Sequence, residues 1–307
     1  MQTRELHILS QDTRSSTLAL ILYRYGDARN LTFVLPKGPV HFNWPEPFRL
    51  SATTPVCGGE GKIVCSHTRY NKAPVNFLLP KPKSRYITIL RHPVSHFESV
   101  FAFFRMAKKL ELPNDANPIE TFLRSNPKDT PERRFQTLGN PSMFDFGFDQ
   151  KYFENRNVVM KHINYIEEEF DLVLINEHYD ESLILFKNLF CWDLEDILYL
   201  EHKVRQKRAA LSNEMKANIL SWSHSDVLLY KHFNATLWRK ISEAGPKFFE
   251  DLQLFHQKNK PLQAVCLGKR GKGELEIDSE KNVENYSRMC KKMAKGIISY
   301  LAYTKKN

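Results

Sequence analysis

The sequence YITILRHPVSHFESVFAFF, at residues 86–104, predicts one strand followed directly by one helix. Residues 86–90 are rich in β-branched and aromatic side chains, which is typical of a strand. Pro93 suits the first turn of a helix. The residues at i, i+3, i+4 and i+7 of this helix are apolar and predict one buried face: Phe97, Val100, Phe101 and Phe104. A strand that leads straight into a helix is half of a parallel βαβ unit.

The first residues of the chain predict a second unit of this kind. Residues 6–9 (LHIL) suit a buried strand, and a helical pattern follows from Leu18. The polar turn between them puts three hydroxyl side chains at a helix N-terminus: Ser15, Ser16 and Thr17. Free N–H groups and the macrodipole attract anions to such a terminus. The same residues also suit simple N-capping, so both interpretations stay open.

The rest of the chain supplies further elements. Strands are expected at 31–35, 63–65 and 171–175, and helices at 118–124, 151–170, 181–190, 194–200, 211–256 and 288–303. Residues 143–149 (MFDFGFD) are expected to form an aromatic turn. Core candidates among the later helices are Leu220, Trp222, Leu228, Phe233 and Trp238. This order predicts an α/β fold with a central parallel sheet flanked by helices and a helix-rich C-terminal half.

Polar segments follow three of the predicted strands. They are SQDTRSST at 10–17, SHTRY at 66–70 and RHP at 91–93. Ligands of open parallel sheets bind at the carboxyl ends of the strands, so one crevice can collect all three segments. The loop residues Phe42-Asn43-Trp44-Pro45 suit either the face of a sugar or loop packing.

The charge balance favours an anionic partner. Lys and Arg number 45 and Asp and Glu number 35, which gives a net charge of +10. Basic residues gather in separate clusters at 81–85, 201–208 and 268–273, without interleaved aromatic residues in a repeat. Nucleic acid is therefore not an expected partner. No spacing of a metal-ligand cluster is present, so no metal is expected.

Three N-x-S/T sequons, at Asn30, Asn234 and Asn285, hint at a secretory compartment. In that compartment Cys266 and Cys290, two of the five cysteines, can pair and tie down a polar tail. The longest apolar run has about six residues, whereas a bilayer span needs about 20. The first ten residues show no signal-peptide pattern.

Several separate stretches together resemble the galactose 3-O-sulfotransferase family. They are residues 21–38, 63–70, 87–104, 143–149, 170–199 and 230–240. The resemblance implies a single sulfotransferase domain over residues 1–307, with a P-loop-like fold related to nucleotide kinases. It implies 3′-phosphoadenosine 5′-phosphosulfate (PAPS) as donor, without a metal. The acceptor would be the 3-hydroxyl of a terminal galactose on a glycolipid or a glycoprotein. Family members are Golgi membrane proteins, so an anchor upstream of these residues is expected.

The resemblance also implies roles for particular residues. Arg91 and Ser99 match the family's R-x-P…S segment, which holds the 3′-phosphate, and a guanidinium can pair with phosphate through two hydrogen bonds. His67 matches a family histidine and would remove the proton of the acceptor hydroxyl, since imidazole titrates near neutral pH. Alternatively, Arg91 only caps its strand, and His67 only orders its loop. His92 stands where the family commonly has Asp, so we assign it no catalytic role.

The phosphosulfate loop departs from the family pattern. The family reads K-T-H-K-T-A-x-T, whereas residues 10–17 here read SQDTRSST, without either lysine. A lysine there would offset charge that develops on the leaving phosphate. Arg14 is the expected substitute. Either the segment before Ser15 comes from an alternative start or a mispredicted exon, or this is a member with little activity.

Three hypotheses therefore stay open. The first is a PAPS-dependent galactose sulfotransferase. The second is a protein that binds adenosine 3′,5′-bisphosphate without transfer, because the loop lysines are missing. The third is a polyanion binder whose affinity falls steeply with salt.

Overall fold

The structure is a computed structural model of the 307-residue chain. It describes residues 5–9, 15–56, 61–112, 117–124, 138–201, 211–266, 290–294, 296, 298–299 and 301. Within them four strands form one parallel sheet in the order β2-β1-β3-β4. The strands are β1 (Glu5–Leu9), β2 (Ile63–Val64), β3 (Ser84–Leu90) and β4 (Leu172–Ile175). The predicted α/β class with a parallel sheet is confirmed.

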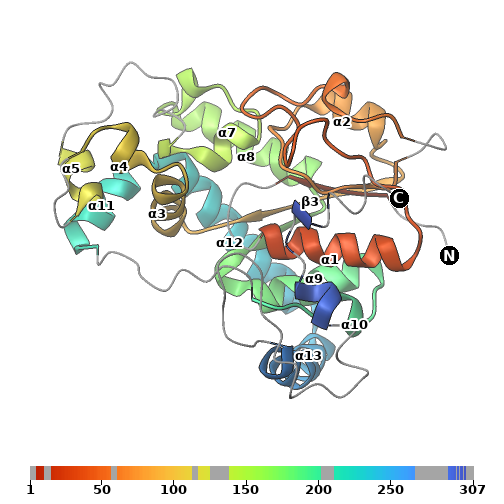
Figure 1. Cartoon of the computed structure of the whole chain (residues 1–307). Coiled ribbons are helices and arrows are strands. Elements are labelled where there is room, and N and C mark those ends of the chain that lie inside the picture. Colours follow the sequence, from red (N-terminus) through yellow and green to blue (C-terminus); the bar gives the residue numbers. More distant parts are fainter. Residues whose placement is uncertain are drawn as a thin grey trace.

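Both predicted strand–helix units form. β1 precedes α1 (Ser15–Ala28), and β3 leads directly into α3 (Pro93–Phe103), which has proline at its N-terminus (Figure 1). The predicted buried face of α3 is confirmed for its first three members, whereas Phe104 follows the helix as its C-cap and is only half-buried. The positions of these units are therefore readable from local pattern.

The predicted strand at 31–35 is wrong as a strand. The segment makes a single parallel bridge, between Phe33 and Ile63, and the Val34 N–H donates to the Ile63 carbonyl at 2.8 Å. Pro36 then forms an antiparallel bridge with Thr53. β2 offers only two residues for pairing, so this edge of the sheet ends in isolated bridges instead of a ladder.

Helices dominate the second half of the chain, as predicted. The remaining helices are α2 (Lys72–Leu78), α4 (Met106–Lys109), α5 (Pro118–Arg124), α7 (Pro141–Asp145), α8 (Arg156–Glu169), α9 (Tyr179–Phe190), α10 (Leu194–Ile197), α11 (Asn213–Trp222), α12 (His224–Ala244) and α13 (Pro246–Cys266). Short 3-10 turns lie at Leu50–Ala52, Gln150–Tyr152 and Asn176–His178. The helix predicted at 194–200 is shorter, because Leu198 leaves the helical conformation with ψ 142°.

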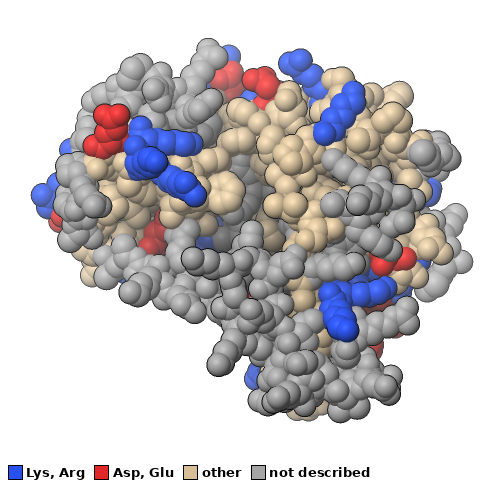
Figure 2. All heavy atoms as spheres, in the orientation of Figure 1, with Lys and Arg blue, Asp and Glu red and all other residues tan. Residues whose placement is uncertain are grey.

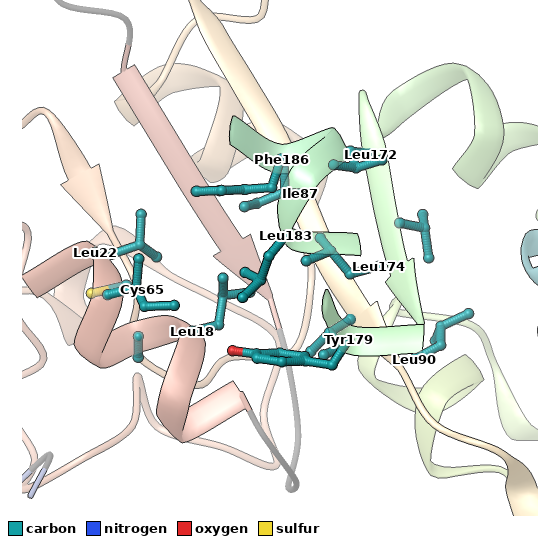
Figure 3. Close-up of a cluster of buried hydrophobic side chains, with 14 of the residues drawn as sticks. Leu18, Leu22, Cys65, Ile87, Leu90, Leu172, Leu174, Tyr179, Leu183 and Phe186 are labelled. Carbon is teal, nitrogen blue, oxygen red and sulfur yellow. The ribbon is translucent and has the colours of Figure 1, made fainter. Parts of the chain in front are cut away.

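Two clusters of apolar side chains form the core. The larger cluster packs α1 and α9 against the sheet, with Leu18, Ile87, Leu174 and Phe186 among its members (Figure 3). The second cluster joins α3, α4, α5 and α11, which lie together at one side of the molecule (Figure 1). Trp222 and Phe233 are buried as predicted, and Leu220 and Leu228 pack half-buried against the core.

Trp238 was predicted to lie in the core, and this is wrong. It is 43% exposed on α12 and packs edge-on against His178, with 4.9 Å between the ring centroids. The periodic pattern of α12 does not distinguish a ring on the rim from a ring in the core, because both recur at helical spacing.

The predicted pairing of Cys266 with Cys290 is confirmed. The disulfide joins the last residue of α13 to Cys290, which lies in the helical residues described at 290–294. Cys65 is buried and Cys191 exposed, and both are free thiols. No helix within the described ranges is both long enough and apolar enough to span a bilayer.

Candidate functional site

The four strands are parallel, so their carboxyl ends share one edge of the sheet. In sheet order, the segments that follow these ends carry His67 after β2, Ser15 to Thr17 after β1, Arg91 after β3 and Glu177 after β4. Neighbouring strands lie about 4.8 Å apart. The topology therefore brings the predicted site segments to one edge of the sheet. The segment that follows β1 lies between the segments that carry His67 and Arg91.

The N-terminus of α1 follows β1 at this edge of the sheet. Ser15 and Ser16 are half-buried, Thr17 is buried, and the first turn of this 14-residue helix contains no acidic residue. Its first N–H groups lack partners within the helix. Arg14, the expected substitute for a family lysine, lies outside the described residues.

Arg91 follows β3 directly, and Ser99 lies inside α3; both are half-buried. The turn between strand and helix is held from β4. The backbone N–H of His92 donates to both carboxylate oxygens of Glu177, each at 3.1 Å, and the Tyr230 hydroxyl donates to the same carboxylate at 3.1 Å. Sequence reasoning missed Glu177, although the polar run Asn176-Glu177-His178 directly after a predicted strand was an available signal.

A buried polar group lies near enough to Arg91 to feel its charge. His96 in α3 contacts the Ser142 hydroxyl through Nδ1 at 3.3 Å. Burial, and secondarily the charge of Arg91, lower the pKa of His96 to about 3, so this imidazole is neutral. Asp226 accepts the backbone N–H groups of Ser142 and Met143, each at 2.9 Å, while burial raises its pKa to about 6. These contacts fix α7 against α3 and α12.

The loop that carries His67 is anchored to α7. The Tyr70 N–H donates to the Asp145 carbonyl at 2.6 Å, and the Arg69 guanidinium donates to the Phe144 carbonyl at 3.1 Å. The guanidinium also lies 4.1 Å from the centre of the Phe144 ring. His67 itself is half-buried. The MFDFGFD segment, predicted as an aromatic turn, thus begins in α7 and holds this loop.

The aromatic loop residue Trp44 lies beside His67, with 5.6 Å between the ring centroids. Its indole N–H donates to the buried carboxylate of Asp145 at 3.0 Å. The loop therefore meets the His67 segment and α7 at one place.

On the face shown in Figure 2, the Lys and Arg side chains of the described residues lie in separate groups. Over the described ranges, no group of three or more His, Cys, Asp or Glu side chains could hold a metal ion.

Known proteins identify the class. The family model described as galactose-3-O-sulfotransferase matches residues 3–303, and the chain belongs to this family. The resemblance read from the sequence is confirmed.

Particular relatives are 33% identical to the chain over the aligned residues. Galactosylceramide sulfotransferase of Mus musculus is 33% identical over 262 residues, and that of Homo sapiens is 33% identical over 267 residues. Each match covers 83% of this chain and 62% of the relative. Galactose-3-O-sulfotransferase 2 of Homo sapiens is 33% identical over 275 residues, which cover 86% of this chain and 68% of the relative. The chain thus spans somewhat less than two thirds of the galactosylceramide sulfotransferases.

Proposed function

We propose that this protein is a PAPS-dependent sulfotransferase that acts on the 3-hydroxyl of a terminal galactose. The observation that carries the proposal is the order of side chains along the sheet edge: His67 after β2, the hydroxyl residues of α1 after β1, and Arg91 after β3. A donor laid along this edge would present its 3′-phosphate to Arg91 and its sulfuryl group beside α1, with the acceptor on the β2 side.

In this proposal Arg91 and Ser99 bind the 3′-phosphate through charge-assisted hydrogen bonds. The N-terminus of α1, with Ser15, Ser16 and Thr17, faces the 5′-phosphosulfate, as in a P-loop-like fold. Because the helix N-terminus carries partial positive charge, it offsets the charge that develops on the leaving phosphate. Arg14 adds a full charge to this group.

The proposed reaction is an in-line displacement at sulfur. The acceptor 3-hydroxyl oxygen attacks the sulfur, while the bond from sulfur to the 5′-phosphate oxygen breaks. His67 takes the hydroxyl proton, and adenosine 3′,5′-bisphosphate leaves. Such a base contributes about 10²–10⁴-fold in rate.

The proposed acceptor is a galactosylceramide-like glycolipid, with a galactose-terminated glycoprotein as the alternative. Support for the glycolipid comes from the galactosylceramide sulfotransferases among the relatives of this chain. The corresponding location is the Golgi membrane, with the catalytic domain in the lumen.

The donor site is tested by nucleotide binding to the whole chain. We expect Arg91→Ala and Ser99→Ala to weaken binding of adenosine 3′,5′-bisphosphate, about 10–100-fold for the arginine, because a hydrogen bond to a charged group contributes about 1.5–3 kcal/mol. Arg124→Ala is the control, since this side chain is 78% exposed and forms an ion pair with Glu120 on the same helix. Unchanged affinity in the folded Arg91→Ala variant would contradict the donor site.

Transfer is tested separately with labelled PAPS and either galactosylceramide or lactose. We expect labelled product from the native chain. In His67→Gln we expect turnover to fall by about 10²-fold or more, with unchanged nucleotide affinity. The missing loop lysines favour a second candidate, a family member that binds adenosine 3′,5′-bisphosphate without transfer. That candidate predicts thermal stabilisation by the nucleotide, no product, and turnover only after Ser10→Lys and Thr13→Lys.

A further inference from the structure

The loop at residues 41–48 pairs with the His67 loop at both of its ends, but not in between. His41 bridges His67 and Pro47 bridges Arg69, both in parallel orientation. Between these two bridges the His67 loop advances two residues, from 67 to 69, whereas the other loop advances six, from 41 to 47. The extra residues, 43–46, must therefore project from the paired segments, and the Glu46 N–H closes their turn on the Asn43 carbonyl at 3.1 Å.

Trp44 occupies this projection and is held from the inside. Its ring stacks on Phe104, with 5.8 Å between centroids and 13° between planes, and meets the edge of Phe144 at 6.2 Å. Its only polar ring atom donates to Asp145, which is 6% exposed. Trp44 is half-buried and its N–H is directed to Asp145, so any part of the ring that reaches the surface consists of carbon.

A flat apolar surface beside a candidate base suits a sugar. The axial 4-hydroxyl of galactose leaves the opposite face of the ring with C–H groups, which pack against an aromatic ring. Sugar-sized ligands bind where apolar rings adjoin a few placed polar groups. His67 must lie within about 2.6–3.2 Å of the acceptor hydroxyl to take its proton. A galactose in that position also reaches Trp44, whose ring centroid is 5.6 Å from that of His67.

The position in the sheet favours the acceptor over the adenine of the donor. Trp44 adjoins the segment that follows β2, whereas Arg91 follows β3, two strands away and therefore about 10 Å across the edge. Adenine and the 3′-phosphate are carried by the same ribose, so the base lies on the Arg91 side.

We infer that Trp44 is the platform on which the acceptor galactose stacks, and that Asp145 is a positioning residue that fixes its indole ring. This inference rests on the proposed function for the choice of acceptor. Asp145 Oδ1 accepts the indole N–H, whereas Asp145 Oδ2 is buried without a hydrogen-bond partner among the described residues.

The test compares acceptor and donor parameters of Trp44→Leu, Trp44→Phe and the native chain. For Trp44→Leu we expect the KM for lactose or galactosylceramide to rise about 10-fold, which corresponds to about 1.4 kcal/mol. The Kd for adenosine 3′,5′-bisphosphate should stay within about two-fold, and Trp44→Phe should retain most of the acceptor affinity. Trp238→Leu is the matched control, because this tryptophan is 43% exposed on α12.

Asp145 is tested with Asp145→Asn and Asp145→Leu. Asparagine keeps an acceptor for the indole N–H and should keep the KM near the native value, whereas leucine should raise it as Trp44→Leu does, with a smaller change in kcat. A weaker nucleotide affinity in Trp44→Leu would instead place the ring under adenine. That outcome, or an unchanged acceptor KM, would overturn the inference.

A direct binding measurement separates this inference from the proposed activity. Saturation-transfer NMR of the native chain with adenosine 3′,5′-bisphosphate should show contact with methyl β-galactoside, weaker contact with its 4-epimer methyl β-glucoside, and loss of both in Trp44→Leu. A chain that binds the galactoside through Trp44 but makes no product would uphold the platform and refute the activity. A chain that makes product with an unchanged acceptor KM in Trp44→Leu would do the reverse.

Discussion

Gly147 shows how one residue fixes the loop of the candidate base. Its φ is +80°, and a Cβ at this position would lie 2.6 Å from the Tyr70 carbonyl oxygen. The backbone of the MFDFGFD segment therefore touches the chain three residues after His67. Only a residue without a side chain allows this approach.

We expect Gly147→Ala to lower the free energy of unfolding by about 1–3 kcal/mol, because left-handed backbone strain and a steric contact act together. Gly245→Ala is the matched control, since Gly245 has φ +70° and nothing within 4 Å of the added Cβ. Urea unfolding of both variants measures the difference. An equal decrease in the free energy of unfolding of both variants would mean that the contact with Tyr70 is not destabilising.

His96 and Asp226 make the stability of the protein depend on pH in opposite directions. The pKa of buried His96 is lowered to about 3, below its usual value of about 6.5, so the unfolded state binds more protons between these values. Its contribution to stability is complete above pH 6.5 and is lost as the pH falls. The pKa of Asp226 is raised to about 6, so its contribution instead decreases as the pH rises from about 4 to 6.

We expect His96→Gln, which keeps a hydrogen-bonding side chain beside Ser142, to remove the first effect and leave the second. Near pH 5 the slope of unfolding free energy against pH should therefore be more negative than in the native protein by about 1.4 kcal/mol per pH unit. Urea titrations between pH 4.5 and 6 measure both slopes. Parallel slopes would show that His96 is not a buried neutral imidazole.

Among the elements, the β3–α3 unit was the most readable from sequence. β-branched residues filled a buried strand, proline began the helix, and the aromatic face of α3 entered the second core cluster. The segment at 31–35 had a similar composition but found only one bridge on the short β2. Strand propensity describes fitness for a sheet and cannot supply the partner.

The three sequons lie in different elements, and the structure favours one of them for glycosylation. Asn30 is exposed just after α1, whereas Asn234 is half-buried inside α12 and its partner Thr236 donates to Glu167 at 3.3 Å. Asn285 lies outside the described residues. A glycan needs an accessible surface asparagine.

For protein secreted from a glycosylating host, we expect Asn30→Gln to remove the mass of one glycan. Asn234→Gln should leave the mass of the glycoprotein unchanged apart from the substitution. Intact mass spectrometry before and after glycosidase treatment measures both. A glycan on Asn234 and none on Asn30 would reverse this assignment.

At the scale of the whole molecule, the disulfide joins α13 to the last described residues. Cys266 and Cys290 are 24 positions apart, and a loop of this size lowers the entropy of the unfolded chain enough to stabilise the fold by about 3 kcal/mol. We expect the double variant Cys266→Ala/Cys290→Ala to lose about this amount in urea unfolding. Cys191→Ala, which replaces an exposed free thiol, is the control and should change little. A reducing agent that leaves the native midpoint unchanged would contradict a stabilising bond.

The sequence by itself determined the class of fold, most helices and the segments that converge on the sheet edge. These depend on local patterns of apolar residues and on the order of elements along the chain. In a parallel sheet the segments that follow the strands all lie at one edge, so chain order predicts which segments meet there. Family resemblance added roles for Arg91, Ser99 and His67, which stay proposals.

Only the tertiary structure decided which distant residues support that edge. Trp44 meets Asp145 across 101 positions, and His92 meets Glu177 across 85. The sequence can mark Trp44 and Glu177 as candidates, but it does not show which residues they pair with, because each contact forms only when separate elements pack. The exposure of Trp238 was decided in the same way: helical spacing gives the direction of a side chain, but the neighbouring elements determine whether anything covers it.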